Sequence, residues 1–363
     1  MLDAGYDDGL PAELPSDTQN PAQGEVIMSC FDHLLHRIAV SLAAVSLCAA
    51  VAIGAETPAT PDFVPGSWTM VLLPDTQIYS EQLPGLFTLQ THWIVKNKDK
   101  FNIRYVLTLG DITNGDTDRE WQHAQEALTE LDGQVPYALV PGNHDYTPHG
   151  NAASGKSGLN KYLPASKFKD WPTFGGVMKD GDITSSYHLF SAGGTDWILL
   201  ALEWAPRNET VQWANDVLAK YPERKAILAT HAYLYDDSTR YDFAAKKDTQ
   251  NWNPHTYASD APVNDGEELW QKLVRKNNFV FTFNGHVCHT PNCTGFLSSK
   301  NDRGKLVHQM LVDYQARNLG GEGYLRILEF LPDGRTVHVK SYSPLYDTYL
   351  PDPANQFTVE LDP

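Results

Sequence analysis

Five polar clusters in this chain of 363 residues contain the side chains that bind divalent cations. The clusters are Asp75-Thr76-Gln77, Gly110-Asp111, Gly142-Asn143-His144-Asp145, Thr230-His231 and Asn284-Gly285-His286. Carboxylate oxygens, amide oxygens and imidazole nitrogens are ligands of hard and borderline divalent ions, and a pair of ions needs one carboxylate that bridges them. A turn explains one such cluster, because Asp and Asn cap turns, but it does not explain five. The clusters therefore predict a metal site.

Each cluster directly follows an apolar run that indicates a buried strand. The strands are predicted at Trp68–Leu73, Tyr105–Leu109, Tyr137–Val140, Ala226–Ala229 and Phe279–Phe283. In open α/β sheets, ligands bind in the crevice beyond the carboxyl ends of the strands. The clusters are therefore in the position where a binding site is expected.

The remaining pattern alternates helices with strands and ends in an antiparallel tail. Helices are predicted near Leu86–Asn97 and at Asp118–Leu131, Glu209–Tyr221 and Gly266–Lys276. Further strands are predicted at Tyr187–Phe190, Trp197–Leu202 and Leu306–Tyr314, and in a hairpin of Tyr324–Phe330 and Thr336–Tyr342. Residues 147–183 form an insertion that is too long for a simple connector. This order favours one α/β domain with a mixed sheet or a pair of sheets.

Composition limits the classes of partner. Hydrophobic residues make up 42% of the chain, enough for a large core. The formal net charge is −17, and the sequence contains no run rich in Lys and Arg, which argues against a surface for nucleic acid or for an anionic membrane. The acidic field would also repel a phosphate ester, but a bound cation reverses such a field locally.

The amino-terminal region is expected to be removed or disordered. Residues 1–27 are acidic and lack periodicity, which indicates disorder or an upstream extension from a misplaced start codon. The apolar run from Ile38 to Ile53, followed by small residues, predicts a signal peptide over 28–55 and export to the periplasm or the exterior. The run is short for a membrane span, which needs about 20 residues, so no stable span is expected after processing; an uncleaved anchor is the alternative. A linker is expected over 56–66, one domain over 67–350 and a tail over 351–363.

Taken in order, the clusters resemble the pattern of the calcineurin-like metallophosphoesterase superfamily, which is Asp-x-His, Gly-Asp, Gly-Asn-His-Asp, a lone His and Gly-His-x-His. The resemblance covers most of 68–345, and Asp313-Tyr314-Gln315 with Gly320-Gly321-Glu322 looks like an exported bacterial branch. It implies a four-layer α/β fold in which two mixed sheets pack face to face between helices. It also implies an enzyme that hydrolyses phosphate esters of a small phosphorylated substrate, through a metal-bound hydroxide at a centre of two divalent metal ions, Mn, Fe, Zn or similar.

The resemblance also assigns roles to individual residues. Asp111 would bridge the two ions, and Asp75 would hold the first ion. His144 would donate to the phosphoryl oxygens or to the leaving group, oriented by Asp145. The second ion would have a full set of ordinary ligands, namely Asp111, Asn143, His231 and His286.

Two departures from the family pattern affect the first metal site. Gln77 stands where the family has its first His, and its amide oxygen is a weaker, neutral ligand. Cys288 stands at the second His of Gly-His-x-His, where it is either a thiolate ligand or part of a disulfide with Cys293, which export favours. His289, one residue later, would then substitute. One of the two ions is therefore expected to bind weakly.

Two other functions are compatible with these residues. One is a phosphatase with a single metal and a degraded first site, and the other is a secreted binding protein that keeps the fold and a structural metal without turnover. The His144-Asp145 pair favours an enzyme, because a structural metal site has no use for it. Arg207, Tyr235 and Arg240 are candidates for contacts with the substrate, since an Arg can meet a phosphate and the aromatic loop directly follows His231.

Overall fold

The computed structural model describes residues 63–147, 150, 156–289 and 293–363. The expected upstream extension and signal peptide, and the linker up to residue 62, lie outside the described residues. Within the described ranges, no helix combines the length and the apolar character that crossing a membrane requires.

The first of two mixed sheets is built around the predicted strand Trp68–Leu73, which is β1. The other strands are β2 (Ile103–Thr108), β3 (Tyr137–Ala138), β11 (Leu325–Phe330), β12 (Thr336–Ser343), β13 (Thr348–Tyr349) and β14 (Gln356–Glu360). Their order is β13-β12-β11-β1-β2-β3, with β14 paired to β12. β1 is parallel to β2 and antiparallel to β11, and all six of its residues are buried. A strand covered on both faces reads as a continuous apolar run, which is why the sequence predicts it within one residue.

The second sheet contains the two strands that precede the Thr230-His231 and Asn284-Gly285-His286 clusters. Its members are β4 (Phe174–Lys179), β5 (Asp182–Ala192), β6 (Thr195–Ala201), β7 (Lys225–Ala229), β8 (Phe279–Asn284), β9 (Cys293–Lys300) and β10 (Leu306–Asp313). Their order is β4-β5-β6-β7-β8-β10-β9. Because β6, β7, β8 and β10 are mutually parallel, their carboxyl ends lie at one edge of the sheet.

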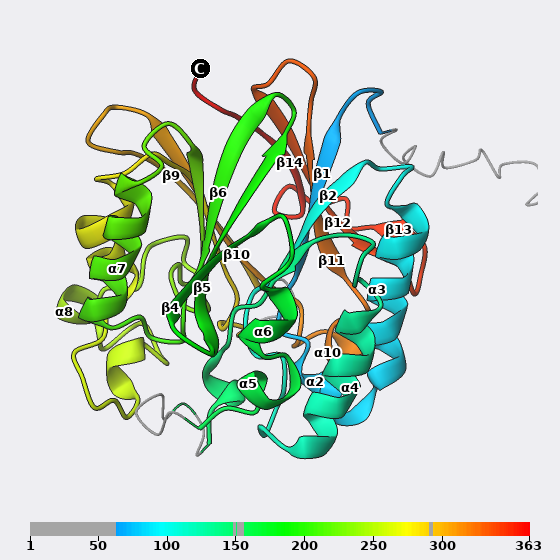
Figure 1. Cartoon of the computed structure of the whole chain (residues 1–363), viewed down its shortest axis with the longest axis horizontal. Helices are drawn as coiled ribbons and strands as arrows, with labels where there is room; N and C mark the ends of the chain where they lie inside the picture. Colours follow the sequence, from blue (N-terminus) through cyan, green and yellow to red (C-terminus); the bar gives the residue numbers. More distant parts are fainter. Residues whose placement is uncertain (1–62, 148–149, 151–155, 290–292) are drawn as a thin grey trace, which may run out of the picture. The chain divides into compact units, whose positions relative to one another are not determined.

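Helices cover the outer faces of the two sheets (Figure 1). The first sheet is covered by α3 (Pro84–Asn97), α4 (Asp118–Thr129), α5 (Leu159–Tyr162) and α6 (Ala165–Phe168), and the second by α7 (Asn208–Ala219) and α9 (Gly266–Leu269). Side chains alternate along β1, so Met70 and Leu72 pack between the sheets while Val71 and Leu73 pack under helices. These four layers confirm the expected fold.

Several elements differ from the expectation. The 147–183 insertion contributes α5, α6 and the edge strand β4, so its described part belongs to the layers themselves. Residues 351–363 contain β14, which pairs with β12, so the first sheet extends past the boundary expected at residue 350. The helix expected at Gly266–Lys276 is α9 followed by a π-helical turn at Trp270–Val274. Short edge strands such as β14 are half exposed and mix polar with apolar residues, so they lack a clear apolar run.

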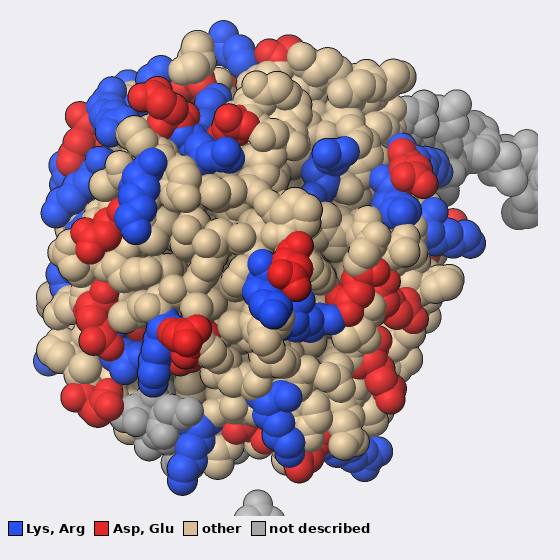
Figure 2. Space-filling view, in the orientation of Figure 1, with Lys and Arg blue, Asp and Glu red and all other residues tan. Residues whose placement is uncertain are grey.

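On the face shown in Figure 2, basic and acidic side chains are interspersed. The excess of acidic residues is therefore not gathered into one patch on this face. Ion pairs between charged side chains of the described residues include Lys161 with Asp118 and Arg275 with Asp302.

Candidate metal centre

The polar clusters of the two sheets meet at the edge where their strands end. Asp75, after β1, accepts a hydrogen bond on Oδ1 from the backbone N–H of His286, after β8, at 3.0 Å. These residues are 211 positions apart in the sequence and belong to different sheets. Asp111, after β2, accepts a hydrogen bond on Oδ1 from the backbone N–H of His144 at 2.9 Å. The structure thus brings together in space the clusters that the sequence places at separate strand ends.

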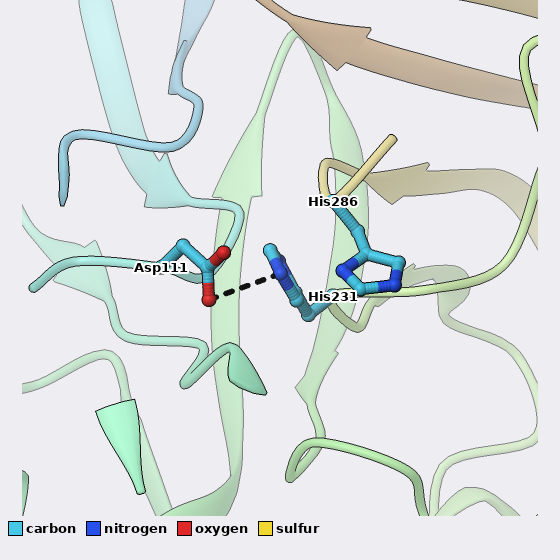
Figure 3. Close-up of side chains that lie close together, drawn as sticks. All are labelled: Asp111, His231 and His286. Carbon is cyan, nitrogen blue, oxygen red and sulfur yellow. Dashed lines mark ion pairs between the residues drawn. The ribbon is translucent and has the colours of Figure 1, made fainter. Parts of the chain in front are cut away.

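Asp111, His231 and His286 form a buried group (Figure 3) in which one ligand atom of each lies within 4.8 Å of the others. Nε2 of His231 is 3.1 Å from Oδ1 of Asp111. The other ring nitrogen of each histidine bonds a backbone carbonyl, His231 Nδ1 that of Leu109 at 2.7 Å and His286 Nε2 that of Trp252 at 2.8 Å. A carbonyl only accepts, so these nitrogens carry a proton, and each ring in its neutral form has a lone pair on its remaining nitrogen. Histidines that bind metals are held in this way.

The charge states of Asp111 and His286 are those that a cation requires. Burial alone would raise the pKa of Asp111, but the imidazoles of His231, His144 and His286 more than offset it and lower the pKa to about 2. Burial, with a contribution from His231, lowers the pKa of His286 to about 3. At neutral pH the carboxylate is therefore ionised and His286 is neutral, the forms in which both bind metals.

Three residues of the site have a strained backbone. The φ angles of Asp75, Asp111 and His286 are 37°, 46° and 81°, a region that residues other than glycine rarely adopt. Such a conformation costs on the order of 1–3 kcal/mol per residue and is found mainly where function requires it. Strain at three clustered polar residues supports the interpretation of this edge as a functional site.

Two glycines allow the backbone to approach the carboxylates closely. A Cβ atom on Gly142 would lie 2.1 Å from Oδ1 of Asp111, and one on Gly285 would lie 2.0 Å from Oδ2 of Asp75. Neither position has room for a side chain. This explains physically why the Gly-Asn-His and Gly-His clusters both begin with glycine.

Buried oxygens in the site have no hydrogen-bond partner among the described residues. These are Asp75 Oδ2, Gln77 Oε1 and Asn143 Oδ1. An unpaired buried polar atom costs about 1–3 kcal/mol, and a bound cation would satisfy it. Together with the two imidazoles, they make an oxygen and nitrogen set that suits divalent ions. The residues present therefore fit a divalent metal centre.

The structure corrects the expected role of Asp145. Its carboxylate is fully buried and accepts hydrogen bonds from the backbone N–H groups of Ile112, Thr113 and Gly142 at 2.8–3.1 Å and from the Thr113 hydroxyl. It thereby ties the loop after β2 to the short 3₁₀ helix at Asn143–Asp145. The His144 ring is oriented by a different group, because its Nδ1 lies 2.7 Å from the carbonyl oxygen of Asn114.

The structure also decides between the alternatives for the first metal site. Cys288 forms a disulfide with Cys293, so it offers no thiolate. His289, the expected substitute, directs Nδ1 to Oδ2 of Asp236 at 2.7 Å, and its ring stacks on Trp252. These contacts hold His289 against the loop after β7. Gln77 is buried in the first turn of α2 (Gln77–Gln82), beside Asp75 in the sequence.

The three candidates for substrate contacts are engaged elsewhere. Arg207 forms an ion pair with Glu203 at 2.8 Å and lines a separate cavity with Tyr146 and Asp182. Arg240 forms an ion pair with Glu267 at 2.6 Å and lies over the ring of Trp270. The hydroxyl of Tyr235 accepts the backbone N–H of Asn251 and lies 3.4 Å from His289. None of the three lines the cavity above Asp111.

That cavity has a volume of about 230 Å³. Its lining residues are Asp111, Asn143, His144, Trp252, Tyr257, His286, Cys288 and Gln315. Trp252, Tyr257 and Gln315 were not predicted as site residues, because the two aromatic residues come from a long polar loop and Gln315 from a turn after β10. An aromatic residue in a loop carries no signal of its own in the sequence. The packing of Tyr257 against Trp204, which also contacts His231 and His286, is a tertiary feature.

A model of the calcineurin-like phosphoesterase family matches residues 72–290 of this chain. Among curated proteins, the chain is 34% identical over 306 residues to the uncharacterized protein YvnB of Bacillus subtilis, a match that covers 81% of this chain and 22% of YvnB. The chain therefore spans about a fifth of the length of this relative.

Two solved structures are similar at low sequence identity. The purple acid phosphatase PPD1 from seeds of yellow lupin (Lupinus luteus) gives a TM-score of 0.50 with 14% identity, over 81% of this chain and 54% of that one. A dimetal phosphatase from Danio rerio gives a TM-score of 0.45 with 12% identity, over 81% of this chain and 99% of that one. The likeness to the lupin protein supports the fold.

Proposed function

This chain belongs to the calcineurin-like phosphoesterase family, and from this premise we propose that it hydrolyses phosphate esters at a centre of two divalent metal ions. Family membership makes it a metallophosphoesterase, a phosphoric ester hydrolase. The observation that carries the proposal is the buried group of Asp111, His231 and His286, in which two imidazoles and a carboxylate lie close together. The unpaired buried oxygens of Asp75 and Asn143 offer further ligand atoms.

The residues divide into two proposed ligand sets. Asp111 is assigned to both, because its carboxylate lies 3.1 Å from Nε2 of His231, and Nδ1 of the same ring lies 4.0 Å from Asp75. Asp75 and Gln77 belong to the first set, and the second contains Asp111, Asn143, His231 and His286. When bound, divalent ions supply a water activated for attack near neutral pH and neutralise the charge on the phosphoryl oxygens. They would also reverse the repulsion expected from a chain of net charge −17.

His144 is proposed to move a proton during the reaction. It lines the cavity, and the Asn114 carbonyl keeps the proton on its Nδ1. Nε2 is therefore the nitrogen that gains and loses a proton. In the charged form, Nε2–H can donate a hydrogen bond to a phosphoryl oxygen or give its proton to the leaving group. Asp145 contributes to the position of His144 indirectly, because it accepts a hydrogen bond from the backbone N–H of Gly142 in the same loop.

The size of the cavity supports a small phosphorylated substrate. A space of about 230 Å³ is below the range of about 300–1,000 Å³ that is usual for drug-sized ligands, and its walls include the aromatic rings of Trp252 and Tyr257. A phosphoryl group and the first part of its leaving group would occupy it.

The test is an assay of purified protein with a generic aryl phosphate monoester and an aryl diester, together with elemental analysis of bound metal. We expect turnover that a chelator abolishes and that added divalent ions restore. A chain that binds its metals stoichiometrically but turns over neither ester would support the binding protein instead. Turnover with one bound ion per chain would support the single-metal phosphatase, which the replacement of both first-site imidazoles favours.

We also propose that the chain works outside the cytoplasm. Disulfides persist in oxidising compartments, and Cys288 is bonded to Cys293. The apolar run before residue 55 supports the same location. Amino-terminal sequencing of the native exported protein should find an end near Glu56, whereas an end at Met28 or Met1 would contradict a cleaved signal peptide.

A further inference from the structure

The first metal site lacks both imidazoles of the family pattern. Gln77 replaces one, and Cys288, held in a disulfide, replaces the other. Asp75 and the shared Asp111 are the remaining anionic groups assigned to it. Since His289 is bound to Asp236, another side chain must complete the site if it holds an ion at all.

Asp313, the last residue of β10, lies at the same edge as the proposed ligands. β10 is parallel to β8, with Leu311 opposite Asn284. Continuing this register by two residues brings Asp313 level with His286, whose backbone N–H binds Asp75. The parallel register thus places a third carboxylate beside the loop that carries His286. This residue binds Asp75 through its backbone and belongs to the second site through its imidazole.

The Asp313 side chain is fully buried, and only one of its oxygens is explained by the fold. Oδ1 accepts the backbone N–H of Gln315 at 2.8 Å, whereas Oδ2 has no hydrogen-bond partner among the described residues. The same holds for Asp75 Oδ2, Gln77 Oε1 and Gln315 Oε1. A turn at residues 313–315 needs a single acceptor, which Asn or Ser would supply without a buried charge. The turn therefore does not account for a carboxylate at this position.

Asp75 and Asp313 are both buried carboxylates whose Oδ2 atom has no hydrogen-bond partner among the described residues. Burial raises the pKa of Asp75 well above its usual value, and Asp313 contributes more to this rise than Asp111 or Asp145. Burial likewise raises the pKa of Asp313; His231 partly offsets this rise, and Asp111 adds to it. Buried like charges need a cation or a partner of opposite charge.

We propose that Asp313 is a ligand of the first metal site and takes the place of the imidazole that Cys288 does not supply. This inference rests on the proposed function. The first site then consists of oxygen donors alone, namely Asp75, Gln77, Asp111 and Asp313. Oxygen-only sites suit hard ions such as Mn²⁺ and Mg²⁺, whereas imidazole suits Zn²⁺ and Fe. The centre is therefore built for two different ions.

The test compares metal binding by the full chain and by Asp313→Asn. Asn keeps the Oδ1 acceptor of the turn and the side-chain volume, so the substitution removes only the charge and the anionic ligand. Both proteins are stripped with a chelator, loaded with one equivalent of Zn²⁺ and titrated with Mn²⁺, with free Mn²⁺ measured by electron paramagnetic resonance. We expect the wild-type chain to bind Mn²⁺ at least tenfold more tightly than the variant, with Zn²⁺ retained by both.

Asp236→Asn is the matched control, because it removes the same charge from a carboxylate that binds His289. Its Mn²⁺ affinity should equal that of the wild-type chain. Equal Mn²⁺ affinity in Asp313→Asn and the wild type would overturn the inference while leaving the two-metal function intact. A wild-type chain that binds Zn²⁺ but no second ion would overturn both.

Thermal unfolding provides a second measurement that does not depend on activity. Removing one of several buried like charges should raise the melting temperature of the stripped Asp313→Asn protein. The further rise on adding Mn²⁺ should be smaller than in the wild-type chain. If Asp313→Asn does not fold, Asp313→His serves instead, since an imidazole ligand there should shift the preference of the first site from Mn²⁺ toward Zn²⁺ by at least tenfold. An unchanged preference in a folded Asp313→His protein would contradict the inference.

Discussion

The two halves of the proposed metal centre are built in different ways. In the second half, two imidazoles are held by backbone carbonyls, so their ring orientation and tautomer are set before any ion binds. The first half contains carboxylates and amides whose buried oxygens are unpaired among the described residues. Burial, together with the neighbouring Asp313 and Asp111, raises the pKa of Asp75, and a bound ion would offset this effect.

This difference predicts which half of the centre binds its metal ion more tightly. A preorganised site loses little free energy on ordering its ligands, whereas a site of like charges depends on the occupant. We therefore expect a tightly bound ion at His231 and His286 and a more easily lost ion at Asp75. Four measurements test this difference in affinity between the two halves.

Asp111→Asn should have the largest effect, because Asp111 is the ligand that both halves share. We expect loss of metal from both sites and a fall in kcat/KM on the order of 10³-fold or more. Elemental analysis and an aryl ester assay measure the two effects. Asp118→Asn, which changes an exposed carboxylate paired with Lys161, is the control and should keep both metal and rate. Retention of one full equivalent of metal by Asp111→Asn would show that the halves do not share this ligand.

His144→Ala should leave both halves occupied and slow the reaction. His144 is assigned to the substrate rather than to an ion, so its loss removes one proton donor, worth on the order of 10²-fold in kcat. Metal content should equal that of the wild-type chain, and His92→Ala, at an exposed position, should change neither quantity. Metal loss from His144→Ala would instead make His144 a ligand.

Removal of metal by dialysis should separate the halves directly. We expect the easily lost ion to leave first, so that dialysed protein retains about one equivalent and regains activity by about tenfold when Mn²⁺ is added. Titration calorimetry measures the two affinities. Two equal and tight affinities would remove the contrast between the halves.

Gln77→His should have the smallest effect, which is an increase in metal affinity. An imidazole in place of a neutral amide oxygen should raise the affinity of the first half for Zn²⁺ by about tenfold. Gln82→His is the matched control on the same helix, since Gln82 is exposed and should leave the affinity unchanged. If both variants bind metal like the wild-type chain, Gln77 is not a ligand.

Much of this site could be predicted because each polar cluster directly follows a buried strand. The apolar runs of β1 and β8 are covered on both faces, so their ends are readable from the sequence within one residue. Once strand ends are known, sheet geometry places their loops at one edge. The spacing of Cys288 and Cys293 likewise indicated the disulfide that the structure contains. These features are local, and local features were sufficient for the family and the fold.

The tertiary structure determined which hydrogen-bond or ion-pair partner each polar side chain has. Asp145 was expected to orient His144, but packing between two loops gives its oxygens to backbone N–H groups instead. Arg207 was a candidate for phosphate until folding placed it against Glu203. An ionic or polar side chain binds whichever group the fold brings nearest, and sequence distance does not reveal that group.

Asp313 is the clearest case of what the sequence alone did not decide. It ends an apolar strand like the predicted ligands, yet its neighbours are set by the parallel register of β10 with β8 and by the approach of Asp75 from the other sheet. The amino-acid sequence determined that carboxylates, amides and imidazoles would stand at strand ends. Only the packing of two sheets decided which of them share one buried space, because burial and charge repulsion are properties of residues that are far apart in the chain.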